Sequence, residues 1–431
     1  MRLQLTLLLT AAGLLHAADD DTFLLKGATI HTMAGKDIVN GSILVRGGKI
    51  AGVGQDLAAP GGVKVIDAAG MQVYPGIIDS GTSVGLTEIS GVRETSDVQE
   101  LGKFNPHLRA SVAINPESEH IPVTRANGIT AVLALPEGTG LSGQASLIHM
   151  DGWTTDELEV KRSAAMHLRM PTIGASGLRG GGGGGDSEDP ATGPRLTFDQ
   201  MKQTYDKEMV DLNNFFEAAR RYAQVKASGA PNFKTDLKLE AMLPVIKGDE
   251  PLLITAQRER AIRDALQFAE KQKIRMVLCD PKEAYKLLDE IKKSNVPVVL
   301  GPTLALPLTE DDYYDQPFTT PGQLYKAGIK FAFASFSNQF SRDLPYQAAA
   351  AVPFGLPKEE AMKAITVNAA QIWGVANQMG TIEEGRFADF MITDGDPLEI
   401  QTHVKQLFIK GKNVSLDDKQ KRLYEKYENR P

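Results

Sequence analysis

The sequence predicts an α/β fold whose centre is a TIM-type (β/α)8 barrel. Short apolar segments with the length of buried strands alternate with amphipathic segments of helical spacing, and the links between them are short. The strand-like segments are residues 129–135, 252–256, 275–280, 297–301 and 330–335. Short links between strands and helices favour a parallel sheet, and the number of repeats favours closure into a barrel.

The helical segments support the same interpretation. In residues 258–272 apolar side chains recur on one helix face, from Ala261 to Ala269. Residues 282–293 repeat this spacing, so we expect a second helix there. A helix with one apolar face must bury that face, and the outer wall of a barrel offers the surface for it.

The two ends of the chain have a different pattern. Residues 23–53 contain several short strand-like segments separated by Gly and Asn, and residues 63–67 alternate apolar and polar side chains. Near the other end, residues 404–410 form one more strand-like segment. The N-terminal segments predict a small β module before the barrel.

The N-terminus has the composition of a secretory signal. Arg2 precedes an apolar run over residues 3–15, which is too short to span a bilayer, and small residues follow at Ala17 and Ala18. We therefore expect residues 1–18 to be a signal peptide and the mature chain to be periplasmic or secreted, with no membrane segment.

Cysteine content and charge limit the classes of partner. Cys279 is the single cysteine, so an exported form of this chain has no internal disulfide. The net charge is −7, and charges of both signs are interspersed along the chain. Such a distribution does not indicate nucleic-acid binding, and we expect a small-molecule ligand, with a homo-oligomer left open.

Two motifs carry a resemblance to a known family. Residues 75–86 read PGIIDSGTSVGL, and residues 380–397 read GTIEEGRFADFMITDGDP. Both resemble motifs of the amidohydrolase superfamily, and residues 105–119 and 341–346 resemble an exported imidazolonepropionase-like subgroup of it. After the signal peptide (1–18), the resemblance implies three parts. They are a small composite β-sandwich domain from both termini (19–74 plus 380–415), a barrel (75–379) with an insertion around 170–230, and a C-terminal tail (416–431).

The metal-binding motif of that family is degenerate in this chain. The family places the ligands of a catalytic metal after the first, fifth, sixth and eighth barrel strands. The residues at these positions are Gly81, Ser83, Thr255, Cys279 and Phe336. Glycine cannot ligate, a neutral serine ligates a divalent metal poorly, and Cys279 with Asp280 does not complete a site. We expect no metal or other cofactor.

The histidines do not replace the missing ligands. His107, His120, His149 and His167 lie outside the expected strand ends, and we interpret them as surface or packing residues.

Some residues near the expected barrel mouth are candidates for chemistry or binding. Asp280, with Ser83 or Thr255, is a weak candidate for a base beside a nucleophile. Four further residues are candidates for substrate binding, and the Arg342 guanidinium has the geometry to clamp a carboxylate. They are Glu88, Arg93, Arg342 and Asn338.

Two segments do not fit the barrel repeat. Residues 179–194 contain six consecutive glycines and read as a surface loop. Residues 197–227 form a long polar helical segment, which we interpret as an insertion that could cover the barrel mouth.

Three functional hypotheses follow from these residues. The first is an amidohydrolase-like barrel that has lost the metal centre and binds a small molecule or a partner. The second is an active hydrolase of non-peptide C–N bonds, such as those of a cyclic amide or imidazolone, with zinc at a relocated site or with no metal. The third is an interaction protein that assembles through residues 179–194 and 197–227. A fold alone does not decide between them.

Overall fold

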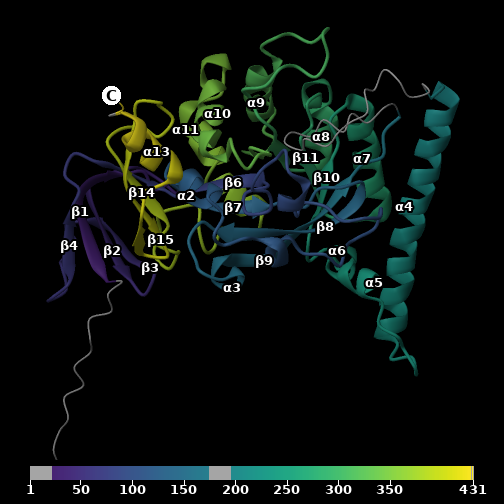
Figure 1. Cartoon of the computed structure of the whole chain (residues 1–431), viewed down its shortest axis with the longest axis horizontal. Helices are drawn as coiled ribbons and strands as arrows, with labels where there is room; N and C mark the ends of the chain where they lie inside the picture. The colour runs from purple at the N-terminus through teal and green to yellow at the C-terminus, as the bar shows by residue number, and fades with distance from the viewer. Residues whose placement is uncertain (1–21, 174–195, 429, 431) are drawn as a thin grey trace, which may run out of the picture.

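The computed structural model describes residues 22–173, 196–428 and 430 (Figure 1). The expected signal peptide (1–18) and the glycine-rich segment (179–194) lie outside the described residues. Two eight-stranded sheets form the frame of the protein, one built from both ends of the chain and one at its centre. Within the described residues, no helix has the length and apolar character needed to cross a membrane.

The terminal sheet contains strands from both ends of the chain, as predicted for the small domain outside the barrel. Its strand order is β16-β15-β14-β5-β1-β2-β3, and β4 pairs with β1. The rings of Phe23, Phe390 and Phe408 pack together in its core, with Phe390 and Phe408 4.8 Å apart. The strands are β1 (Phe23–Ile30), β2 (Ile38–Arg46), β3 (Lys49–Gln55), β4 (Lys64–Asp67), β5 (Gln72–Pro75), β14 (Phe390–Thr393), β15 (Val404–Ile409) and β16 (Lys412–Val414).

The central sheet is the predicted barrel, with one strand reversed. Its order follows the chain from β6 to β13, and β8 runs antiparallel to both β7 and β9. The hairpin of β8 and β9 supplies the third and fourth strands, which the sequence pattern did not indicate. The strands are β6 (Ile77–Thr82), β7 (Ile129–Ala134), β8 (Gly140–His149), β9 (Glu159–Arg169), β10 (Leu252–Thr255), β11 (Met276–Cys279), β12 (Val298–Leu300) and β13 (Phe331–Phe333).

The barrel is nearly closed between its first and last strands. No regular ladder joins β13 to β6, but the Phe336 backbone N–H donates to the Gly81 carbonyl oxygen over 2.8 Å. This closure brings the ends of β6 and β13 to one side of the barrel mouth.

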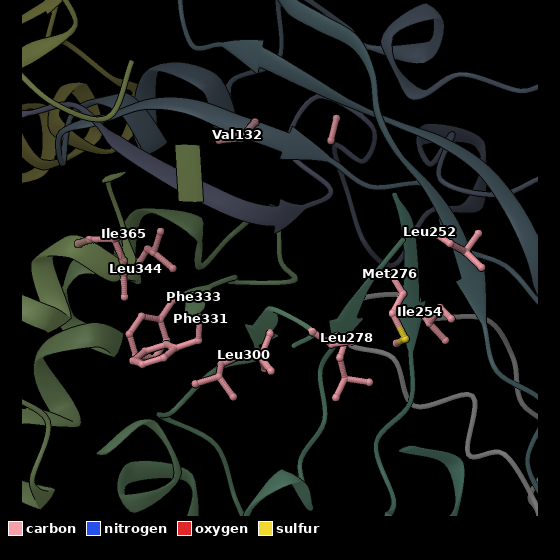
Figure 2. Packing of buried hydrophobic residues seen from close by; sticks show 14 of the residues in the cluster. Val132, Leu252, Ile254, Met276, Leu278, Leu300, Phe331, Phe333, Leu344 and Ile365 are labelled. Carbon is pink, nitrogen blue, oxygen red and sulfur yellow. The ribbon is translucent and has the colours of Figure 1, made fainter. Parts of the chain in front are cut away.

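Alternate residues of the barrel strands pack in two different cores. Leu252 and Ile254 belong to the large core, part of which is shown in Figure 2, whereas Leu253 belongs to a second core with Cys279 and Ala334. Successive side chains of a strand point to opposite faces, so each strand contributes to both cores. This two-sided burial explains why the strands read as continuous apolar runs.

The helices surround the barrel and connect its strands. The segment 282–293, expected as one helix, is divided into η2 and α8, because Leu287 between them leaves helical geometry. The α-helices are α1 (Ala110–Ala113), α2 (His120–Arg125), α3 (Thr155–Leu158), α4 (Phe198–Ala227), α5 (Leu237–Ala241), α6 (Leu243–Lys247), α7 (Glu259–Gln272), α8 (Leu288–Ser294), α9 (Gln316–Lys326), α10 (Leu344–Ala350), α11 (Lys358–Ala364), α12 (Val367–Ile372) and α13 (Lys419–Glu428). The short 3₁₀ helices are η1 (Arg93–Thr95), η2 (Ala284–Lys286), η3 (Ser341–Asp343) and η4 (Val352–Phe354).

The long helix α4 lies along the outer wall of the barrel beside α7 (Figure 1), and it contributes no residue to the lining of the cavity at the barrel mouth. It begins with a capping box between Thr197 and Gln200. Phe216 of α4 packs edge-on against Phe268 of α7, with ring centroids 5.1 Å apart. Because α4 connects β9 to β10 and buries an apolar stripe, it acts as a barrel helix.

Candidate functional site

A cavity of about 580 Å³ opens at the carboxyl ends of the parallel barrel strands. Its lining side chains follow β7, β9, β10, β11, β12 and β13, and they include no residue of α4. In barrels of this class, the carboxyl ends of the strands carry the chemistry. The residues below are therefore the candidates for function.

His167 and Thr255 form a hydrogen-bonded pair at this mouth. His167 lies near the end of β9 and is buried, with Nε2 2.9 Å from Thr255 Oγ1 and Nδ1 2.7 Å from the Pro136 carbonyl oxygen. The expectation that His167 lies outside the strand ends is wrong, because β9 was not recognised as a barrel strand. Burial, helped by the charge of Arg169, lowers the pKa of His167 to about 3, so its imidazole is neutral.

The neighbouring strand end carries Cys279 and Asp280. Burial raises the pKa of the Cys279 thiol to about 12, so the thiol stays protonated. Burial also raises the pKa of Asp280, against the opposing effects of Lys282, a hydrogen bond from the Gln257 amide, and Arg169. The structure thus brings Thr255 and Asp280 to the same cavity, but their nearest polar partners are His167 and Gln257.

The ring of Phe336 occupies the space beside the first strand. A Cβ atom added at Gly81 would lie 2.8 Å from Phe336 Cε1, and one added at Gly301 would lie 3.5 Å from Phe336 Cε2. Phe336 has a φ of 48°, in the left-handed region that a bulky side chain rarely adopts. Such strain costs roughly 1–3 kcal/mol, and it places the aromatic ring at the mouth.

The donors at this mouth do not fit the metal that the family resemblance implies. Among the described residues, no group of three or more His, Cys, Asp or Glu side chains is placed to hold a metal ion. His167 Nδ1 faces a carbonyl oxygen, and Nε2 faces Thr255. The position of the first-strand ligand is Gly81, against which the Phe336 ring lies. A catalytic site needs about three protein ligands and an open position.

A buried carboxylate that the sequence analysis did not single out joins the two strands of the barrel seam. Asp79 Oδ1 accepts hydrogen bonds from the backbone N–H groups of Gly81 and Ser335, at 3.1 and 3.0 Å. Asp79 Oδ2 accepts from the hydroxyls of Ser335 and Ser341, at 2.5 and 2.7 Å. Burial raises the pKa of Asp79 to about 6 despite these donors. An acid placed directly after the apolar pair Ile77 and Ile78 of a buried strand was the available signal.

The other candidates are spread over the rim and the surface. Asn338 lines the cavity, and its side-chain amide donates to the Thr87 carbonyl oxygen over 2.8 Å. Ser83 and Glu88 are half-buried and lie outside the lining, as does the exposed Arg93. Arg342 also lies outside it, with its guanidinium 3.5 Å from Asp343.

Part of the chain matches a family model. Residues 275–414 match the model of the amidohydrolase family. Amidohydrolase tasK of Hapsidospora irregularis is 23% identical over 405 residues, which cover 88% of this chain and 40% of that protein. The chain therefore spans about two fifths of the length of this curated relative.

Solved structures share the fold over nearly the whole chain. The crystal structure of an amidohydrolase from Thermotoga maritima MSB8 is similar with a TM-score of 0.77 and 24% identity, covering 91% of this chain and 99% of that one. Phenylurea hydrolase B is similar with a TM-score of 0.56 and 16% identity, covering 92% and 97%. At these identities the similarity shows the fold, which is the barrel and terminal sheet described above.

Proposed function

We propose that this chain, which has the fold of the amidohydrolases, binds a small polar molecule at the barrel mouth without a metal ion. The position of the Phe336 ring against Gly81 carries this proposal. In the family that the sequence resembles, a metal-binding histidine stands where Gly81 stands here. A side chain at that position would collide with the ring, since even a Cβ atom would lie 2.8 Å from Phe336 Cε1.

The size and lining of the cavity support a small-molecule ligand. A volume of about 580 Å³ lies within the ~300–1,000 Å³ typical of such sites. Arg169 and Lys282 bring positive charge to the lining, and Glu137 and Asp280 bring carboxyl groups whose pKa values burial raises. Convergent polar groups among apolar lining residues such as Leu135 and Phe336 orient a ligand and make its binding specific.

A second candidate function is a metal-free hydrolase of non-peptide C–N bonds. The pairing of Thr255 Oγ1 with His167 Nε2 favours it, because a hydroxyl, a base and a third group that orients the base form the pattern of an activated nucleophile. The pKa of His167, lowered to about 3 by burial, makes it a weak proton acceptor. We therefore rank binding above hydrolysis.

The two candidates and the metal-dependent alternative differ in measurable ways. Elemental analysis of the purified protein should find no stoichiometric zinc, and chelator should leave the unfolding temperature unchanged. A ligand-observed NMR screen of small polar compounds should give binders that Asp280→Asn weakens. Lys293→Met, which changes the opposite end of the barrel, should not affect them.

Two outcomes would change the assignment. Chelator-sensitive hydrolysis of amides or ureas that zinc restores would contradict the binding proposal. Chelator-insensitive hydrolysis abolished by Thr255→Val would establish the second candidate.

We further propose that the protein is an exported member of the imidazolonepropionase-like subgroup. The proposal rests on the composition of residues 1–18 and on the resemblance of residues 105–119 and 341–346. N-terminal sequencing of the protein recovered from the producing organism tests export, since cleavage after Ala17 or Ala18 is expected. Light scattering of the mature protein tests for a homo-oligomer, and we propose neither a nucleic-acid nor a membrane partner.

A further inference from the structure

A second and larger cavity opens at the amino ends of the barrel strands, at the end of the barrel opposite the mouth. It measures about 890 Å³ and is bounded by the segments that enter β10, β11, β12 and β13 and by the last turns of α7 and α8. It shares no lining residue with the mouth cavity. We call it the basal cavity, and the function proposed for the mouth does not involve it.

Positive charge is concentrated in the basal cavity. Its lining carries six cationic side chains and two carboxylates, in a chain whose net charge is −7. Buried apolar side chains such as Met276, Ile291 and Ile329 also belong to the lining. A cavity with mainly one sign of charge and low-dielectric walls focuses the electric field and concentrates counter-ions. The cations are Arg263, Lys273, Arg275, Lys292, Lys293 and Lys330, and the acids are Glu270 and Glu290.

Most of these cations are not neutralised by an acid. Arg263 is paired twice, with Glu290 at 3.1 Å and with Glu259 at 2.6 Å, so Arg263 and Glu290 cancel each other. In the part of the chain that the structure describes, none of the other five cations forms an ion pair with a carboxylate. Five positive charges therefore face one remaining carboxylate of the lining, that of Glu270.

Neutral acceptors hold two of these cations in place. Arg275 Nη1 donates to the Gly248 carbonyl oxygen over 3.0 Å, and Lys330 Nζ donates to Gln371 Oε1 over 2.6 Å. A neutral oxygen orients a cation without cancelling its charge, and the guanidinium and the ammonium group each keep further N–H donors. Both charges are therefore positioned and still available to an anion.

The helix ends explain only some of the cations. Lys273 directly follows α7, and Lys292 and Lys293 lie in the last turn of α8, where a cation stabilises the negative end of the helix dipole. Arg275 and Lys330 instead lie directly before β11 and β13, outside the preceding helices. Compensation of helix dipoles therefore leaves these two cations unexplained.

We propose that the basal cavity binds a small anion that carries two or more phosphate groups. Four of the five unpaired cations are lysines, whose ammonium groups bind phosphate oxygens as point charges, whereas bidentate pairing with a planar carboxylate needs an arginine. Arg263, one of the two arginines of the lining, is already occupied by carboxylates. The volume of about 890 Å³ lies towards the upper end of the ~300–1,000 Å³ typical of small-molecule sites, which is more than a single phosphate fills.

Calorimetric titration of the full chain at low salt tests the proposal. Pyrophosphate and citrate carry similar charges near neutral pH but present phosphate and carboxylate groups, respectively. We expect pyrophosphate to bind with a dissociation constant about ten-fold lower than that of citrate. Added salt should weaken this binding, because mobile ions screen exposed charges. Fructose 1,6-bisphosphate distinguishes a phosphate ester from a condensed phosphate, according to which of the two phosphate compounds binds more tightly.

Variants place the binding in the basal cavity. Lys330→Met and Arg275→Met each remove one exposed charge and keep an apolar stem, so each should raise the pyrophosphate dissociation constant about five-fold. Lys412→Met removes an exposed charge from β16 of the terminal sheet and serves as the matched control, for which we expect no change. Thermal unfolding of each variant verifies that it is folded.

The possible results either support or overturn the proposal. It is supported if a phosphate compound binds more tightly than citrate, and if this binding weakens in Lys330→Met and Arg275→Met but not in Lys412→Met. It is overturned if neither phosphate compound binds, if citrate binds as tightly, or if the two basal variants are folded and bind like the wild type. The mouth is tested separately, because ligand binding there should be unchanged in both basal variants.

Discussion

Asp79 is predicted to hold the barrel closed at its seam. The carboxylate joins β6 to the segment after β13 through four donors, where a regular strand ladder is missing. Asp79→Ala removes the acceptor of two buried backbone N–H groups, those of Gly81 and Ser335. Each unpaired buried donor costs about 1–3 kcal/mol, so the unfolding free energy should fall by about 4 kcal/mol.

Asp79→Asn separates the lost acceptor from the lost charge. At pH 5, below the folded pKa of about 6, the wild-type side chain is mostly protonated, and an amide resembles the protonated acid in shape and polarity. The amide oxygen can accept from both backbone N–H groups, while its NH₂ faces hydroxyls that can rotate to accept. The expected loss for Asp79→Asn at pH 5 is about 1 kcal/mol.

Urea unfolding followed by Trp373 fluorescence measures both variants. Trp373 is buried, and its Nε1–H donates to Ser80 Oγ over 3.2 Å, next to Asp79 on β6. Trp153, the other tryptophan, is 86% exposed and contributes little to the change. If Asp79→Ala and Asp79→Asn unfold within about 1 kcal/mol of each other, the argument from unpaired donors is refuted.

Three further predictions concern pH, the mouth and the outer wall. The pKa of Asp79 rises from 3.8 to about 6 on folding, so the folded state binds more protons than the unfolded state between these values. The unfolding free energy should therefore fall by roughly 3 kcal/mol as the pH rises from about 4 to 6. Urea titrations of Asp79→Asn over the same pH range should lack this decrease. Gly81→Ala should lower the unfolding free energy by about 1–3 kcal/mol, because the added methyl group meets the Phe336 ring. The loss should be smaller when Gly81→Ala is made in the Phe336→Ala variant. If the losses of the two single variants simply add in the double variant, this contact is contradicted. Phe216→Ala should lower the unfolding free energy by about 3–5 kcal/mol, because it removes the packing on Phe268. Ligand binding in the NMR assay should not change. Weaker binding in the folded variant would give α4 a role at the mouth.

The strands of the barrel were predictable where hydrophobic pattern alone defines them. β10 to β13 read as buried parallel strands because both of their faces are covered. The β8–β9 hairpin was missed because Ser, Gln, Lys and Arg interrupt its apolar run. Since His167 belongs to that hairpin, its place at the mouth was missed with it.

The candidate site was predictable only in part for the same reason. Thr255 and Asp280 follow strands that the pattern identified, and both line the cavity. Arg93 and Arg342 follow the correct strands but lie outside the lining, because the path of a loop is not encoded in periodicity.

The sequence by itself determined the α/β class, because side-chain type and period are readable along one chain. The resemblance of two motifs to a known family implied that both chain ends join in one domain, and which residues stand where that family has ligands. Only the tertiary structure decided that the Phe336 ring lies against Gly81, that His167 orients Thr255, and that Asp79 binds the seam. Each of these contacts joins residues more than 80 positions apart, so its geometry exists only once the barrel has closed.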